Sequence, residues 1–408
     1  MLRLLFLTLL VLTPVLFPAT ARAQIDPVKR RLLQLGFNQP LENRGPVAAY
    51  AYYYFNEPDY PRTNQTLRLA LAPVYLDSEL GFRGLLGEHT DLALGLAGGG
   101  YADSFSEVRG GHYFREESFI GHGGNISASV YHLFNPGQLI PLNGVLRAGL
   151  HHSLFENDSQ TAAGFTVPTD ITSLNFRTGL RFGGREPLLT PNAAMELSIW
   201  YEGQFRDRDI RYGYAGDRLI KEQSHLFWSR ALLEYTLPES QQFFSAGVTA
   251  GISLEADRFN CFRMGGALPL GAEFPLNIPG YYFQEISARR FVLMNGLYSV
   301  PLDAARQWTL SGFASTATVD YVYGLEQPGN WHSGVGGGLG WRSRDRSLQI
   351  VVGYARGIDA LRNNNHGANS LGLVIQWDLE ARAHAPTRLG APGVAPEKSR
   401  LLERLFGR

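Results

Sequence analysis

The chain has 408 residues, with 37 Lys and Arg residues against 37 Asp and Glu residues, 46 glycines and one cysteine. The balanced charge argues against a nucleic-acid-binding protein, because such proteins need a basic surface to neutralise phosphates. The single cysteine, Cys261, excludes an internal disulfide framework and a thiolate-only metal cluster. The mildly polar mean hydropathy is compatible with a soluble protein, but also with a membrane β-barrel, in which alternation disperses the apolar residues.

The chain begins with the features of a secretory signal peptide. An arginine precedes the apolar stretch 4–17, and a small-x-small cleavage site ends at Ala23. We therefore predict that residues 1–23 are removed after Ala23 and that the mature chain is exported. The alternative, an N-terminal membrane anchor, is disfavoured because the apolar stretch is short and two prolines interrupt it.

A short segment, 24–46, separates the cleavage site from the first clear strand pattern. We expect it to lie in the periplasm, either as a solvated tail or as a docking element, in which Asp26 to Asn38 has the pattern of a short amphipathic helix. It is too short to hold a folded periplasmic domain.

From residue 47 to residue 380, apolar and polar residues alternate with a period of two, which is typical of β-strands. In Met195 to Phe205, for example, the odd positions are mostly apolar and the even positions mostly polar. The charged residues Arg177, Arg181, Glu196, Glu202, Arg230 and Glu234 share the polar face. The predicted strands are 47–57, 66–84, 91–105, 124–134, 142–157, 171–185, 193–207, 224–237, 242–257, 284–301, 307–321, 333–342, 347–357 and 369–380.

Both a soluble β-sandwich and a membrane barrel show this alternation, and the sequence does not reveal which face points outward. Three features favour the barrel. The strands are long, aromatic residues gather at strand ends, and short turns alternate with long polar loops. We predict an all-β transmembrane antiparallel barrel of about 14 strands, within a range of about 12 to 16. An even strand number returns both termini to the periplasm.

Two short motifs lie between the fifth- and sixth-last predicted strands. Phe262-Arg263-Met264-Gly265-Gly266 is followed by Ile278-Pro279-Gly280-Tyr281. With the strands that follow, this order resembles the Omp85 superfamily of bacterial surface-antigen barrels. The resemblance covers roughly residues 242–380 and implies a long loop that folds into the barrel. It also implies the class of Omp85 barrels without periplasmic POTRA domains, since none fits before the first strand.

The sequence departs from this resemblance at two charged positions. In the family, a loop arginine is latched by an aspartate of a following wall strand. Here Pro279 stands at the arginine position, and Ser315, two residues after Phe313, stands at the acidic position. Because one buried charge without its partner would be costly, the joint loss of both is physically coherent. We expect a loop that folds inward through Gly280 and Tyr281 without this ionic latch.

The last predicted strand resembles a barrel-assembly signal, with Ser370, Gly372, Ile375 and Trp377 at its characteristic spacing. It implies recognition by the barrel-assembly machinery during biogenesis. The tail 381–408 follows and is expected to lie in the periplasm, either as a solvated tail or as a docking element for a periplasmic partner. Within it, Glu397 to Gly407 has the pattern of a short amphipathic helix.

The sequence holds no recognisable catalytic, cofactor-binding or metal-binding motif. The stretch Gly121-His122-Gly123-Gly124-Asn125 is similar to an oxyanion-binding loop but has no nucleophile to serve. We predict a protein of the outer membrane, in contact with its lipid, that is not an enzyme and acts as a pore or in translocation or insertion. The alternatives are a plugged structural or surface-antigen barrel without transport and, as a minor one, an outer-membrane lipase.

Overall fold

The computed structural model describes residues 25–26, 28–46, 48–138, 140–184, 193–266 and 274–381. The predicted signal peptide and most of the C-terminal tail lie outside these residues. Among the described residues, no helix has the length and apolar character needed to cross a membrane.

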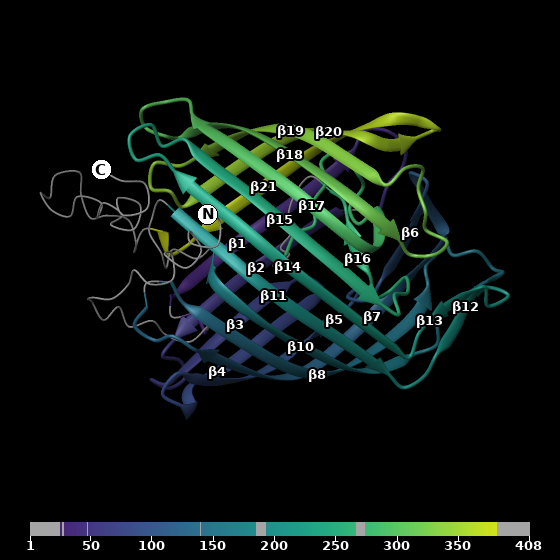
Figure 1. Ribbon diagram of the computed structural model, residues 1–408, viewed down its shortest axis with the longest axis horizontal. Coiled ribbons are helices and arrows are strands. Elements are labelled where there is room, and N and C mark those ends of the chain that lie inside the picture. Colours follow the sequence, from purple (N-terminus) through teal and green to yellow (C-terminus); the bar gives the residue numbers. More distant parts are fainter. Residues whose placement is uncertain are drawn as a thin grey trace, which may run out of the picture.

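The main sheet has 18 strands, of which β6 and β16 are short flanking strands and the other 16 form a closed antiparallel barrel (Figure 1). The barrel strands are β1 (Arg30–Pro40), β2 (Ala48–Pro58), β3 (Gln65–Ala72), β4 (Tyr75–Gly87), β5 (Thr90–Gly99), β7 (His112–Leu133), β8 (Leu142–Asn157), β10 (Ile171–Gly184), β11 (Ala193–Arg206), β14 (Gln223–Thr236), β15 (Phe243–Leu254), β17 (Ile286–Pro301), β18 (Trp308–Tyr321), β19 (Trp331–Arg342), β20 (Leu348–Arg362) and β21 (Asn365–Asp378).

The barrel closes between its first and last strands. The ladder of β1 and β21 runs from Leu32 opposite Asp378 to Pro40 opposite Ser370. Inside the barrel, the Gln34 side chain donates a hydrogen bond of 2.8 Å to Gln376 across this seam. Because every neighbouring pair is antiparallel and the strand number is even, the chain enters and leaves the barrel at the same rim.

The apolar face of the wall points outward. On β11, Leu197 and Ile199 are 51% and 61% exposed, whereas Glu196 and Trp200 are 1% and 3% exposed. A soluble sandwich would bury the opposite set. The structure therefore has the inside-out pattern of a membrane barrel, which supports an outer-membrane location.

The predicted number of about 14 strands was too low, and the structure has 16, the upper end of the predicted range. The predicted strand 66–84 is two strands, β3 and β4, joined by the turn Pro73-Val74, with Ala72 paired to Tyr75. Two residues without Gly, Asn or Asp carry little of the usual hairpin signal, which explains why the turn was missed.

The predicted helix from Asp26 to Asn38 was wrong, because β1 begins at Arg30 and belongs to the barrel. Leu33, Leu35 and Phe37 are exposed on the outer face, which is a period-two pattern hidden among basic residues. The barrel thus runs from 30 to 378 rather than from 47 to 380.

One end of the barrel is covered by strands that leave the wall. They comprise β6 (Phe105–Arg109), β12 (Ile210–Tyr214) and β13 (Arg218–Ile220), which are labelled on the right of Figure 1, and β9 (Phe165–Thr166), which pairs with β12. A shared aromatic core holds them together, and we call this group of elements the cap. The buried members of that core are Phe105, Phe119, Phe165, Ile171, Ile210, Tyr212 and Ile220.

Candidate functional site

The segment 255–285, which joins β15 to β17, carries the two predicted loop motifs and brings them together. Its short strand β16 (Phe262–Met264) pairs with the start of β17. Gly266 forms a β-bridge with Ile278, and the Gly265 amide donates a hydrogen bond of 3.0 Å to the Leu276 carbonyl. The first motif therefore lies directly beside the second, although eleven residues separate them in sequence.

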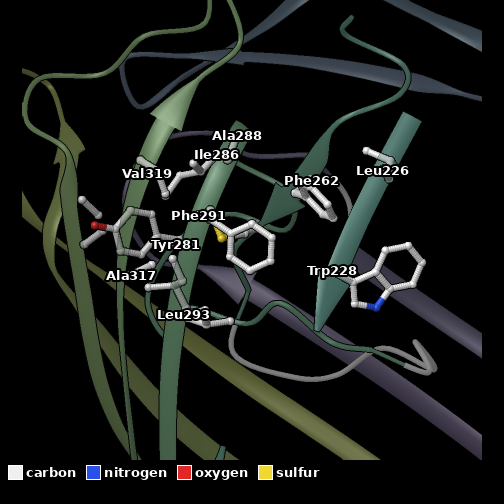
Figure 2. Close-up of a cluster of buried hydrophobic side chains, with 14 of the residues drawn as sticks. Leu226, Trp228, Phe262, Tyr281, Ile286, Ala288, Phe291, Leu293, Ala317 and Val319 are labelled. Carbon is white, nitrogen blue, oxygen red and sulfur yellow. The ribbon is translucent and has the colours of Figure 1, made fainter. Parts of the chain in front are cut away.

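The side chains of this segment belong to the larger of the two apolar clusters. Phe262 is 7% exposed, and Ile278 and Tyr281 are 0% and 1% exposed. Figure 2 shows Phe262 and Tyr281 among side chains from β14, β17 and β18, including Trp228, Phe291 and Ala317. On β14, Trp228 occupies the buried face, whereas the outer face carries the exposed Phe227.

Pro279 and Gly280 contact β19 and β20 at glycines of their inner faces. A Cβ atom on Gly334 would lie 2.1 Å from the Pro279 carbonyl oxygen, and one on Gly280 would lie 1.8 Å from the Gly357 amide nitrogen. Gly280 also has a φ of 84°, which favours glycine. The backbone of the segment thus touches the backbone of the wall.

The structure places the two predicted latch positions side by side. Ser315 on β18 is the ladder partner of Gly334, the residue that Pro279 covers. Phe313, the other predicted wall residue, pairs with Gly336 two residues along. Neither position carries a charge, so the contact here is one of backbone and small side chains.

A buried ion pair lies a few residues further on, at positions that no sequence motif had indicated. The Glu285 carboxylate accepts two hydrogen bonds of 2.9 Å from the Arg362 guanidinium of β20. The Arg362 guanidinium also lies 3.6 Å from the ring centroid of Tyr282. Both charged side chains are almost fully buried, so each depends on the other for compensation.

Hydrogen bonds of two tyrosines complete this contact. The Tyr281 hydroxyl lies 3.0 Å from Nδ1 of His332 on β19, and the Tyr282 hydroxyl donates a bond of 3.2 Å to the Glu42 carbonyl. Burial raises the pKa of Tyr281 and of Tyr282 above the usual range, so both hydroxyls stay protonated. On its other side, the Glu42 carboxylate accepts a bond of 2.6 Å from the Asn369 amide of β21.

A second contact of the same segment is made by Phe274, on a different part of the wall. Its ring centroid lies 5.2 Å from that of Trp200 and 5.9 Å from that of Trp228. The Arg230 guanidinium lies 4.5 Å from the same centroid, and Arg230 Nε donates a bond of 3.1 Å to Glu196. Phe274 therefore sits in a box of aromatic and cationic side chains.

The charged residues predicted to share the inner face are paired there. Besides Glu196 with Arg230, Arg177 lies 3.3 Å from Glu202, and Arg181 lies 3.8 Å from Glu196. Another inner group joins Arg68 of β3, Glu79 of β4 and Arg147 of β8. The wall interior is charged but largely self-neutralised.

The cap and the segment 255–285 are joined by further ion pairs. Arg258 of the segment lies 3.4 Å from the fully buried Glu107 of β6, which also lies 3.5 Å from Arg218 of β13. Arg263 donates a bond of 2.9 Å to the Ser106 carbonyl. Between cap and segment lies a cavity of about 460 Å³ that is lined by both polar and apolar side chains. Burial raises the pKa of the nearby Cys261 thiol to about 11.

The residues that resemble an assembly signal lie in β21, opposite β1. Ser370 and Gly372 are buried toward the inside, whereas Trp377 is 49% exposed on the outer face. Ile375 pairs with Leu35. The glycine-rich stretch at 121–125 is part of β7 and pairs with β8 rather than forming a loop. In the described part of the chain, no group of His, Cys, Asp or Glu could hold a metal ion.

Comparison with known proteins shows a likeness in structure alone. No family model and no curated protein matches the sequence. The structure is similar to CdiB from Acinetobacter baumannii (TM-score 0.57, 11% identity, 86% of this chain and 60% of that one). It is also similar to CdiB from Escherichia coli (0.53, 11%, 86% and 64%) and to BamA from Haemophilus ducreyi lacking POTRA domains 1-3 (0.52, 9%, 86% and 70%).

The chain spans less than two thirds of the length of the two CdiB structures. At this identity the likeness shows the fold alone: this chain shares the barrel fold of the CdiB and BamA structures.

Proposed function

We propose that this chain is an outer-membrane barrel of the Omp85 type that acts as a gated pore in the translocation or insertion of a substrate still to be identified. In this proposal the segment 255–285 folds into the barrel and is the gate. The supporting observation is its contact with two separate parts of the inner wall, through Phe274 on β11 and β14 and through Pro279 to Glu285 on β19 and β20.

The contacts of the gate differ from those that the resemblance implies. Pro279 and Ser315 leave the usual latch uncharged, and Glu285 with Arg362 supplies an ion pair of reversed polarity, with the carboxylate on the segment. Through Tyr282 and Glu42, the same end of the segment reaches the seam between β1 and β21. Release of the gate would therefore clear the lumen and would also remove the contacts that support β1 and β21 at the seam.

Export and assembly belong to the same proposal. Residues 1–23 would direct the chain out of the cytoplasm, and β21 with Ser370, Gly372, Ile375 and Trp377 would be recognised by the barrel-assembly machinery. Both termini would then lie in the periplasm and the cap outside the cell. No catalytic role is assigned to any residue.

Planar-bilayer conductance of the refolded barrel tests the gate. Excision of 267–277 with a two-residue linker from Gly266 to Ile278 removes the Phe274 contact, and Arg362→Ala removes the ion pair. We expect the wild-type barrel to be mostly closed and the combined variant to open. Heat-modifiable gel mobility confirms that each barrel is folded, and Gly312→Ala, at a site with nothing within 4 Å of the new Cβ, is the matched control.

A plugged structural barrel without transport is the second candidate, and the cap favours it. Glu107, Arg218 and Arg258 form a buried charge cluster beneath an aromatic core, which would keep that end shut. If the combined gate variant is folded but does not conduct, the pore proposal fails and the structural role is retained.

A further inference from the structure

The outer wall has a groove that crosses the four neighbouring strands β14, β15, β17 and β18. Its floor follows one row of the ladder, in which Ser229 faces Ala250, Ala250 faces Val292 and Val292 faces Thr318. Ile199 of β11, which is 61% exposed and pairs with Ser229, borders the groove at one side. The groove has a volume of about 690 Å³ and a largely apolar lining.

The upper end of the groove lies at the level of an aromatic row near the cap end of the strands. In the ladder, Tyr201 faces Phe227, Phe227 faces Ile252, and Ile252 faces Arg290. Exposed aromatic residues at strand ends are typical of the boundary between hydrocarbon and headgroups. The groove thus begins at the headgroup level and extends from there toward the membrane interior.

Two arginines stand at this end of the groove. A register irregularity between Ala288 and Arg290 interrupts the β17–β18 ladder, and the consecutive side chains of Arg289 and Arg290 are both exposed, at 47% and 59%. A bulge can re-aim a side chain in this way. The pair shares one carboxylate, since Arg289 lies 2.7 Å and Arg290 3.9 Å from Asp320.

This charge balance points to an anionic ligand. Two guanidinium groups against one carboxylate leave a net positive charge beside an apolar groove. Positive charge on the outer wall of a barrel is unfavourable in hydrocarbon and becomes tolerable at the interface, where an anionic group can compensate it. A guanidinium offers paired donors that match a phosphate.

We propose that this groove binds a phosphate-bearing, acylated glycolipid of the lipid A class, with a phosphate at Arg289 and Arg290 and an acyl chain over Ser229 and Ala250. The site rests on the proposed outer-membrane location, with the cap outside the cell, because this places the groove in the outer leaflet. The lipid is a bound ligand of the wall and is separate from the substrate of the pore.

Titration of the refolded full-length barrel with lipid A, followed by native mass spectrometry, tests this site. We expect the double variant Arg289→Ala, Arg290→Ala to weaken lipid A binding about tenfold or more, since charge-assisted phosphate contacts are lost. Ala250→Phe should weaken binding by filling the groove while leaving the charges in place. Arg356→Ala removes an exposed arginine of β20, which is two strands from β18 and does not line the groove, and is the matched control.

Phosphatidylglycerol and phosphatidylcholine are the competing probes. We expect lipid A to bind more tightly than either, and the difference to vanish in the double variant. Equal binding of all three lipids, or unchanged lipid A binding in both groove variants, would overturn the site. Because conductance is measured on the same preparations, a barrel that opens without binding lipid A contradicts only this site, and one that binds lipid A but never opens contradicts only the gate.

Discussion

The segment 255–285 is held at two places by different kinds of contact. At β19 and β20, backbone lies on backbone at Gly280 and Gly334, and Glu285 is fully paired with Arg362. At β11 and β14, Phe274 is held by ring faces and guanidinium groups that allow many similar geometries. The first contact tolerates almost no displacement, whereas the second weakens gradually. If the segment is the proposed gate, we expect the β19–β20 contact to anchor it and the Phe274 contact to be released first.

The largest expected effect comes from breaking the buried ion pair. Arg362→Ala leaves the Glu285 carboxylate buried without compensation, and we expect the free energy of unfolding to fall by about 3–5 kcal/mol. Urea unfolding of the refolded barrel in lipid measures this loss. Replacing both partners, as in Glu285→Leu with Arg362→Met, should recover most of it, and a double variant as unstable as the single one would show that the pair is not the cause.

A side chain on Gly280 should be the next most disruptive change. Gly280→Val introduces a β-branched residue at φ 84°, with its Cβ 1.8 Å from the Gly357 nitrogen. We expect the free energy of unfolding to fall by about 2–3 kcal/mol. Conductance and limited proteolysis should both report a displaced segment. Gly312→Ala, which meets nothing within 4 Å, should change neither measurement.

Loss of the Phe274 ring should have a smaller effect. Phe274→Ala removes the aromatic and cation–π contacts with Trp200 and Arg230. We expect the contact between the segment and the wall to be weakened by about 1 kcal/mol. Brief openings in single-channel records should become more frequent while the barrel keeps its stability. Phe274→Leu retains apolar volume without a ring, and its opening frequency should lie between those of the wild type and Phe274→Ala. If Phe274→Ala has an effect as large as that of Arg362→Ala, the Phe274 contact is not the weaker of the two wall contacts.

The least direct test of the two contacts is the reactivity of Cys261 beneath the cap. Because burial raises its thiol pKa to about 11, little thiolate exists at pH 8, and alkylation should be about 100-fold slower than for an exposed cysteine. Reaction should speed up as pH rises toward 11 in the folded barrel. In Gly280→Val, the same reaction should be faster at pH 8 if displacement of the segment exposes the thiol, and an unchanged rate would confine the displacement to residues beyond β16.

Much of the barrel could be predicted from the sequence because its period-two pattern is local. Two strands were missed for local reasons as well: Pro73-Val74 lacks hairpin residues, and β1 carries basic residues that are typical of an amphipathic helix. The outward direction of the apolar face was not accessible, since both a sandwich and a barrel produce the same alternation. This direction is known only from the structure, in which apolar residues such as Ile199 are exposed.

The functional role of the predicted site residues stays a prediction, and the structure shows where these residues lie. The two loop motifs lie together, and the uncharged Pro279 and Ser315 positions are close along the wall. The replacement pair could not be predicted, because Glu285 and Arg362 are 77 residues apart and neither belongs to a motif. Tertiary contact alone brings them together, and a single sequence contains no record of such a pairing.

The seam between β1 and β21 also governs the order of events in folding. The hydrogen bond from Gln34 to Gln376 joins residues 342 positions apart, so the ladder can be completed only after almost the whole chain has arrived. Until then, the sheet has two unpaired edges that can join with other chains. A protein built this way must have its edges shielded until its last strand is delivered, and a truncation that removes β21 would leave an open, aggregation-prone sheet rather than a smaller barrel.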